Sequence, residues 1–490
     1  MRYFLFSFLT LIVTPSFLSS QTLEDAVRYS QLEVGGTART VGIGGGIGAL
    51  GSDFSVLSTN PAGLATFRRS EFTFTPTFVN IGDESQLEGQ NDASKSTKVN
   101  FNFNNIGLVF TSQPRNINWT NTAFGFGLNR LAGFPQKAYY EGTSAGSITD
   151  RWVNLAQGKS PGNLGIEEGL AYDAEAIFHP DENDDTFYAS DFMPGEIVWK
   201  SQNIRRKGAY NELVFSYAGN YKERLMIGAT VGIPLVSFEE SKTYFESVVD
   251  PTDTVFNELT YNEKLTTSGA GINLKVGMIL RVNQMLRVGV AVHTPTGLGL
   301  KDNFSSTLDY SFNIGGIPTP GSAVSPDGLF EYRMRTPWRV IGSAGLVFGK
   351  SGFLTAEVEY LDYTNAKFNF NNTDDSGDKA YEQELNQQID DKLNAALNIR
   401  LGGEFALDRF RFRGGYSIMQ SPYSEGFEPI GALSVGAGAW WSESFFMDVA
   451  YKRQLSEGQY SPYLLNGSPA QVVQQTVTRS HFLMTLGFKF

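Results

Sequence analysis

The clearest pattern in the sequence is an alternation of apolar and polar side chains that recurs from residue 70 to the C-terminus. A period of two residues is typical of β-strands with one apolar and one polar face. In the last run, Phe482, Met484, Leu486, Phe488 and Phe490 share one face. About fourteen such runs occur, an even number that is typical of bacterial membrane barrels. The expected strands are 70–80, 99–112, 119–131, 210–222, 224–246, 258–282, 285–295, 329–348, 352–368, 393–407, 409–420, 430–442, 444–456 and 472–490.

The connections between these strands alternate between long and short. The long ones are 81–98, 132–209, 247–257, 296–328, 369–392, 421–429 and 457–471. The short ones centre on Pro114, Tyr221, Asn283, Gly349, Asp408 and Ser442. Outer-membrane barrels have long extracellular loops and short periplasmic turns. The pattern therefore predicts an all-β transmembrane antiparallel barrel of about 14 strands whose C-terminus lies at the periplasmic end.

Two long loops are expected to be partly helical, because the segments 162–178 and 379–393 carry residues at helical spacing. They are expected either to cap the mouth of the barrel or to be surface loops.

The N-terminus has the features of a secretory signal peptide. Arg2 is followed by an apolar run over 3–13 and then by small residues before Gln21. Cleavage is expected after Ser20. The alternative is an uncleaved membrane helix, but the run is shorter than the ~20 residues that such a helix needs.

The mature chain divides into two expected parts. Residues 21–69 lack the alternation, and 35–51 are rich in Gly and Ala. Because this part precedes a closed barrel, we expect it to lie in the lumen as an N-terminal plug, or hatch. Residues 70–490 are expected to form the barrel with its loops.

Charged side chains alternate with apolar ones in three consecutive expected strands. A charge on the lipid face costs roughly 2–4 kcal/mol at the bilayer midplane, so these groups are expected to face the lumen. They are Glu357, Glu359, Arg400, Glu404, Arg411 and Arg413. Opposite charges on neighbouring strands can pair. They either brace the wall as ion pairs or form a network that gates the lumen or positions substrate.

Five aromatic residues lie near expected strand ends: Trp338, Trp440, Trp441, Tyr310 and Tyr332. Aromatic side chains of membrane barrels gather at the interfaces between lipid and water. These five are therefore expected to form an interfacial girdle, and stacking on a ligand is the alternative.

Composition excludes several classes of function. The formal net charge of −12 argues against a protein that coats nucleic acid, and the absence of cysteine excludes disulfides, thiolate chemistry and Cys–zinc sites. Gly46, Gly48 and Gly51 match a dinucleotide-binding pattern but lack the strand and helix that it requires. The G-x-S-x-G pattern at 142–146 lies in an expected outer loop. We therefore expect no catalytic residues, no metal site and no cofactor.

The segment before the barrel contains Gly35-Gly36-Thr37-Ala38-Arg39, Gly44-Gly45-Gly46, Asp53 and Asn60-Pro61-Ala62-Gly63-Leu64-Ala65. With these motifs the chain resembles the long-chain fatty-acid transporter (FadL/TodX, OmpP1-like) family of outer-membrane proteins. The Asn-Pro-Ala signature after a Gly-rich plug is the most specific match. His293-Thr294-Pro295-Thr296 and Thr336-Pro337-Trp338-Arg339 are also similar to family motifs.

The resemblance implies a 14-stranded barrel with a hatch and passive uptake of long-chain fatty acids or similar hydrophobic compounds. In that family substrate is captured at the outer face and leaves sideways through the wall. The role of the signature segment at the hatch and the wall opening carries over to Asn60, Pro61, Ala62 and Gly63. The outer ligand pocket does not carry over residue by residue.

The expected location is the outer membrane of a Gram-negative bacterium. The expected partners are hydrophobic small molecules, outer-membrane lipid and the outer-membrane assembly machinery, with no nucleic acid, and the barrel is expected to be a monomer. One alternative is a PorV-like protein-binding barrel that serves type IX secretion, and another is a general porin. The plug weighs against an open porin, whereas the loops do not decide between lipid and protein ligands.

Overall fold

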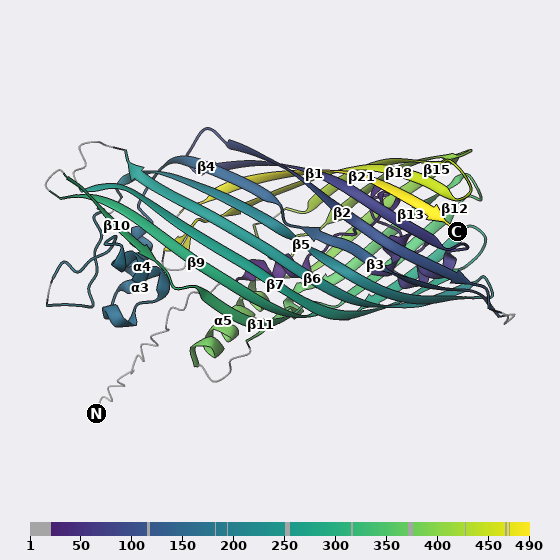
Figure 1. Cartoon of the computed structure of the whole chain (residues 1–490), viewed down its shortest axis with the longest axis horizontal. Coiled ribbons are helices and arrows are strands. Elements are labelled where there is room, and N and C mark those ends of the chain that lie inside the picture. Colours follow the sequence, from purple (N-terminus) through teal and green to yellow (C-terminus); the bar gives the residue numbers. More distant parts are fainter. Residues whose placement is uncertain are drawn as a thin grey trace, which may run out of the picture.

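The computed structural model describes residues 21–490 except 115–117, 182, 194, 250–254, 315–316, 371–375, 427, 466–467 and 470. Within this part, 19 strands form one sheet, and its first and last strands, β1 (Glu71–Leu87) and β21 (Val473–Lys489), pair antiparallel. This pairing closes the sheet into a barrel (Figure 1). The expected signal peptide, 1–20, lies outside the described residues.

The other strands are β2 (Ser94–Ser112), β3 (Trp119–Gly133), β4 (Gln136–Ala145), β5 (Ile197–Tyr221), β6 (Leu225–Val248), β7 (Phe256–Arg281), β8 (Leu286–His293), β9 (Gly297–Ile314), β10 (Ile317–Val324), β11 (Gly328–Arg335), β12 (Arg339–Val347), β13 (Gly352–Asp362), β14 (Lys367–Phe370), β15 (Ala395–Leu407), β16 (Phe410–Met419), β17 (Ile430–Trp440), β18 (Phe445–Tyr460), β19 (Leu464–Leu465) and β20 (Ser468–Pro469). The helices are α1 (Leu23–Ser30), α2 (Ala38–Gly42), α3 (Thr149–Ala156), α4 (Ile166–Asp173) and α5 (Ser376–Lys392), with 3₁₀ turns η1 (Phe54–Ser58), η2 (Pro61–Thr66), η3 (Pro161–Asn163) and η4 (Tyr363–Asn365).

The barrel has 14 antiparallel passes, because several strands are pieces of one interrupted pass. β8 and β9 pair with successive parts of β7 and are separated by Thr294-Pro295-Thr296. On their other side, β8 pairs with β12 and β9 pairs with β11. β11 and β12 are separated by Thr336-Pro337-Trp338. Proline has no N–H to donate, so each break falls where a ladder hydrogen bond is lost. The predicted fold class, a closed barrel of about 14 strands, is confirmed.

Several predicted boundaries are wrong, because the strands extend further from the turns than the alternation does. β4 and the first half of β5 occupy part of the predicted loop 132–209, and β9 and β10 occupy much of 296–328. The single strand predicted over 329–348 is broken at Pro337. Backbone pairing does not require an apolar face, so polar strand segments escape a search for alternation.

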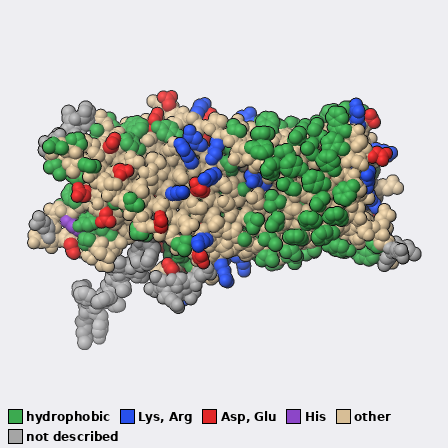
Figure 2. Space-filling model, in the orientation of Figure 1, with side chains coloured by type: hydrophobic (Ala, Val, Ile, Leu, Met, Phe, Trp, Pro, Cys, Tyr) green, Lys and Arg blue, Asp and Glu red, His purple; other side chains and the backbone are tan. Residues whose placement is uncertain are grey.

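Exposed apolar side chains form a belt around the half of the barrel that carries the C-terminus (Figure 2). Members of this apolar belt include Phe78, Ile227, Val276, Leu433 and Phe482. We name the end with the short connections and Phe490 the turn end, and the opposite end, with α3 and α4, the loop end (Figure 1). A continuous apolar band on a closed barrel is the surface that matches a membrane interior.

Two of the five expected girdle aromatics do not reach this surface. Tyr310 and Tyr332 are each 1% exposed, because they point into clusters inside the wall. Trp338 and Trp441 are 51% and 64% exposed, in accord with an interfacial position.

The loop end is filled by an aromatic cluster. Tyr140, Trp152, Tyr188, Tyr261 and Tyr310 are all buried there, between α3, α4 and the outer parts of the wall strands. α4 lies within the expected helical segment 162–178, and α5 overlaps the other, 379–393, but begins three residues earlier, at Ser376. α3 was not expected. The helices in the described part of the chain are all too short or too polar to span a membrane.

Candidate functional site

Residues 21–69 run through the interior of the barrel and contact its wall on several sides. The Ala38 N–H donates to Thr485 Oγ1 of β21 at 2.7 Å, and Thr355 Oγ1 of β13 donates to the Gly46 carbonyl at 2.7 Å. Most of this segment is buried, from α1 through η2. Its first helix packs beside β11, β14 and α5, and its later part packs against the inner side of β2, β3, β6 and β7. We refer to the whole segment as the plug.

Polar caps hold the short turns of the plug. Thr37 caps α2 and Asp53 caps η1, and the two caps are joined by a 2.6 Å hydrogen bond from Thr37 Oγ1 to Asp53 Oδ2. Such caps satisfy the free N–H groups at a helix start. They let very short helices persist where water is excluded.

Asn60 caps η2 and joins it to two other places. Its Oδ1 accepts from the Ala62 N–H at 3.2 Å, and its Nδ2 donates to the Gly48 carbonyl at 2.7 Å. The same Nδ2 lies 3.3 Å from the Met278 carbonyl of β7. Pro61 is the first residue of η2, where no N–H is needed. The signature segment therefore lies directly against the wall.

This close approach depends on glycines in the wall. A Cβ at Gly277 of β7 would overlap Asn60 Oδ1, and a Cβ at Gly228 of β6 would lie 2.5 Å from the Pro61 carbonyl oxygen. Gly63 is itself confined, since a Cβ there would lie 2.9 Å from Val56 Cγ1. Ala62 is fully buried.

The wall next to Asn60 carries a second polar group, which the sequence did not indicate as a unit. His293 Nε2 lies 2.6 Å from the Thr59 carbonyl oxygen. Ser58 Oγ donates to Glu212 Oε2 at 2.8 Å, and Glu212 forms an ion pair with Lys275. His293 belongs to a motif quoted above, but its partner in the plug is more than two hundred positions away.

The luminal charges pair between neighbouring strands. Arg400 binds Glu357 at 2.8 Å and also pairs with Glu359, which accepts from Arg339 at 2.9 Å. The Gly48 N–H of the plug donates to Glu357 Oε2 at 2.9 Å. One buried carboxylate therefore joins the wall network to the plug.

The other predicted charges form a second group. Arg413 binds Glu404 and Asp448, each at 2.7 Å, and Arg39 of the plug lies 3.5 Å from Glu404. Arg411 stands at the edge of this group, 4.0 Å from Glu404, and it donates to backbone carbonyls near the turn. The structure thus brings together five of the six predicted charges in two groups and leaves Arg411 at the margin.

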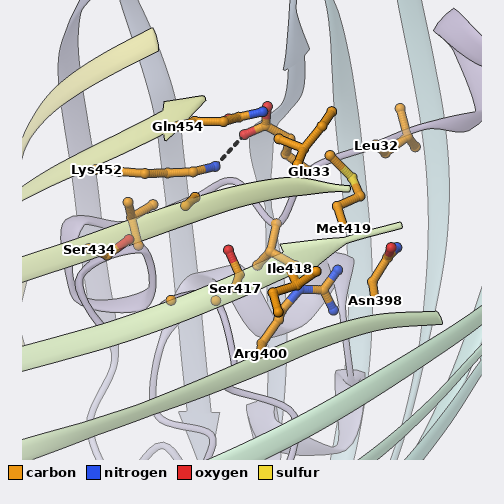
Figure 3. A pocket seen from close by; sticks show the side chains of 16 residues that line it. Leu32, Glu33, Asn398, Arg400, Ser417, Ile418, Met419, Ser434, Lys452 and Gln454 are labelled. Atoms are coloured by element: carbon orange, nitrogen blue, oxygen red, sulfur yellow. Dashed lines mark hydrogen bonds and ion pairs between the residues drawn. The ribbon is translucent and has the colours of Figure 1, made fainter. Parts of the chain in front are cut away.

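Three pockets surround the stretch of the plug between α1 and α2. The first, of about 500 Å³, is lined by Glu33, Arg400 and Lys452 among others (Figure 3). Lys452 Nζ donates to Glu33 Oε2 at 2.5 Å. Burial alone would raise the pKa of the Glu33 carboxyl, but the nearby charges of Lys452 and His481 outweigh it and lower the pKa to about 2. Glu33 is therefore ionised at neutral pH.

The wall is interrupted beside the second pocket. β2 pairs with β3 only from Asn105 to Ser112, and among the described residues no strand pairs with 94–104 on that side. β3 shifts register between Arg130 and Ala132, and the chain leaves β3 before Pro135. We name this interruption the wall gap.

The plug covers the wall gap from inside. The Glu33 N–H donates to the Leu131 carbonyl at 2.8 Å, and Asn104 Nδ2 donates to the Gly36 carbonyl at 2.7 Å. The pocket here measures about 610 Å³ and is lined by Asn100 and Asn102 of β2 as well as by the plug. On the outer face of β2, Phe101 and Phe103 are exposed within the apolar belt.

No known protein-family description matches the sequence, and no curated protein matches it. Solved structures do match. A FadL homologue from Pseudomonas aeruginosa superposes with a TM-score of 0.55 at 11% identity, covering 94% of this chain and 99% of that one. The toluene transporter TodX from Pseudomonas putida superposes with a TM-score of 0.51 at 10% identity, covering 93% and 99%. This chain has the FadL/TodX-type barrel fold. At such low identity the likeness concerns the fold.

Proposed function

We propose that this protein carries hydrophobic small molecules, such as long-chain fatty acids, across the outer membrane of a Gram-negative bacterium. It captures them at the loop end and releases them sideways through the wall gap. The wall gap is the observation that carries the proposal, because it offers an exit at the level of the apolar belt. The names of the two superposed proteins, a FadL homologue and a toluene transporter, support the class of substrate.

The axial route is obstructed. Ile43, Ile47, Leu50 and Phe54 of the plug are buried, and they belong to a cluster that includes Met226 of the wall. A hydrophobic molecule gains nothing from a water-filled pore, whereas a sideways exit leads it directly into lipid. Asn60, Pro61, Ala62 and Gly63 hold the plug against β6 and β7. The luminal charges hold it at other places, where Glu357 accepts from the Gly48 N–H and Glu404 pairs with Arg39. We assign both groups a role in keeping the plug seated.

Transport through the wall gap can be tested by filling its pocket. Asn102 lines the pocket from β2, so Asn102→Trp should obstruct the passage and reduce uptake of a fluorescent fatty acid into proteoliposomes to the rate of empty liposomes. Asn80, exposed on the outer face of β1, provides the matched control, and Asn80→Trp should transport normally. Full uptake by folded Asn102→Trp would show that substrate does not pass there.

Mass spectrometry of the purified protein separates this proposal from a protein-binding barrel. Co-purified fatty acids or similar lipids are expected. A stoichiometric exported protein in their place would favour the PorV-like alternative.

A further inference from the structure

A group of basic side chains lies on the outside of the barrel, on the loop-end side of the apolar belt. Lys137 of β4 pairs in register with Arg205 of β5, which pairs with Ser241 of β6, which in turn pairs with Lys264 of β7. Directly paired residues of antiparallel strands point to the same face. This row therefore presents three cations over four neighbouring strands.

Two more cations extend the group. Lys207 follows on β5, with its side chain 63% exposed, and Lys98 reaches across the wall gap to donate to the Arg206 carbonyl at 2.8 Å. We name Lys98, Lys137, Arg205, Lys207 and Lys264 the basic patch. Figure 2 shows basic side chains gathered beside the belt on the visible face.

The basic patch borders an open groove of about 990 Å³. Lys98, Arg205 and Lys207 line it together with hydroxyl groups of Ser241 and Thr243. Glu239 is the acidic side chain in its lining, and it is paired with Lys207 at 2.9 Å. Within the described residues, Arg205 forms no salt bridge, so the groove keeps an excess of positive charge. Ammonium, guanidinium and hydroxyl donors together suit a phosphate group.

The sign of this charge is opposite to that of the chain as a whole. The chain as a whole carries a formal charge of −12. At the turn end, two of the basic residues, Arg68 and Arg281, share one acid, Glu223. The basic patch lies where β2 enters the apolar belt at the exposed Val99. Lys98 pairs in register with the inward-facing Ile81, and its side chain reaches the patch along the edge of the wall gap. Cations at this depth face lipid headgroups.

We propose that the basic patch binds the phosphate groups of a phosphorylated glycolipid in the outer leaflet of the membrane. This proposal rests on the proposed function only for the location in the outer membrane and for the orientation, in which the loop end faces the outside of the cell. The ligand is a glycolipid of the lipopolysaccharide type, because lipid of this type forms the outer leaflet at that face. Since Lys98 spans the wall gap, the bound lipid would lie beside the exit that we propose for substrate.

Native mass spectrometry of the full-length protein with added lipid A tests this proposal. The variant Arg205→Ser/Lys207→Ser removes two cations from the groove. The control Lys222→Asn/Lys350→Ser removes two exposed cations from turns at the other end of the barrel. Loss of two contacts at the membrane surface should weaken binding of bisphosphorylated lipid A by roughly tenfold or more in the first variant, and the control should bind normally.

Two further probes define the ligand. Dephosphorylated lipid A should bind the unmodified protein as weakly as phosphorylated lipid A binds the patch variant. Phosphatidylglycerol should bind less well than lipid A. Equal retention of lipid A by patch variant and control, or by phosphorylated and dephosphorylated lipid, would overturn the proposal. Equal binding of phosphatidylglycerol would reassign the patch to phospholipid.

Gel mobility with and without heating confirms that each variant is folded. Fatty-acid uptake is measured separately, so failure of one proposal does not imply failure of the other.

Discussion

At the scale of single residues, the contact between plug and wall depends on glycines of the wall, which leave space, as much as on the polar side chains that fill it. The Asn60 side chain accepts from the Ala62 N–H at the start of η2 and donates to the carbonyls of Gly48 and of Met278 in the wall. It can do so because Gly277 leaves room for its amide. A second contact between a glycine and a polar side chain joins plug and wall elsewhere in the lumen, where the Gly48 N–H donates to Glu357.

Gly277→Ala should loosen the plug, because the added Cβ would overlap Asn60 Oδ1. Overpacking of this kind costs about 1–3 kcal/mol. We expect faster hydrogen exchange across η2, measured by mass spectrometry. Gly342→Ala is the control, because a Cβ at this wall glycine meets no atom within 4 Å. Unchanged exchange in Gly277→Ala would mean that the contact is dispensable.

The Glu33–Lys452 pair predicts a response to acid. The pKa of Glu33 is about 2 in the folded protein, below its ordinary value of 4.5. A lowered carboxyl pKa stabilises the fold above the ordinary value, and this contribution disappears as pH falls from about 4.5 toward 2. Exchange of 31–36, corrected for its intrinsic pH dependence, should be constant from pH 7 to 5 and rise below about pH 4. Glu33→Gln should remove that step, and a step of equal size in the variant would assign it to another group.

At the scale of elements, α5 takes the place of a missing strand. β14 pairs with β11 on one side, and on the other its backbone is satisfied by side chains of α5. Asn386 Oδ1 accepts from the Phe368 N–H at 2.9 Å and its Nδ2 donates to the Phe368 carbonyl at 3.0 Å. Glu382 accepts from the Phe370 N–H at 2.6 Å. A helix therefore completes the wall outside the apolar belt, where a strand edge would otherwise be free.

Asn386→Leu should free this edge. It removes both hydrogen bonds to Phe368 and leaves part-buried backbone groups unpaired, at a cost of about 1–3 kcal/mol. We expect faster amide exchange in β14 and α5. Gln383→Ala, at an exposed position of the same helix, should leave exchange unchanged. If Asn386→Leu exchanged like Gln383→Ala, the side-chain bonds would not hold α5 in place.

At the scale of the whole molecule, the barrel has a wall that closes on itself and an interior that is occupied. β1 and β21 complete the sheet, and the plug contacts wall strands from β3 to β21. The luminal face that remains is polar and charged, as Glu357, Arg400 and Arg413 show. Without the plug, such a lumen would fill with water.

Deletion of 21–69 should therefore convert a closed barrel into an ion-conducting one that transports hydrophobic substrate poorly. Planar bilayers should show large steady currents for the deleted form and none for the complete protein. Gel mobility before and after heating would show whether the deleted barrel is folded. A folded deletion variant that stays closed would contradict the role of the plug.

The sequence by itself determined the class of fold. Alternation along strands such as 272–280 follows from lipid on one side and lumen on the other, and this constraint acts locally on each strand. Glu357, Glu359 and Arg400 could be assigned to the lumen for the same reason, since a charge is excluded from the lipid face. The polar outer strands were missed, because beyond the membrane neither face must be apolar.

Only the tertiary structure decided which groups meet. The contacts of Asn60 with Met278, of Glu33 with Lys452 and of Gly48 with Glu357 join positions that lie far apart in the chain. The wall gap and the basic patch are likewise products of register, which is set by the pairing of whole strands. Residue type and spacing are local properties, whereas a lumen, a gap and a surface exist only when the barrel closes and brings distant strands together.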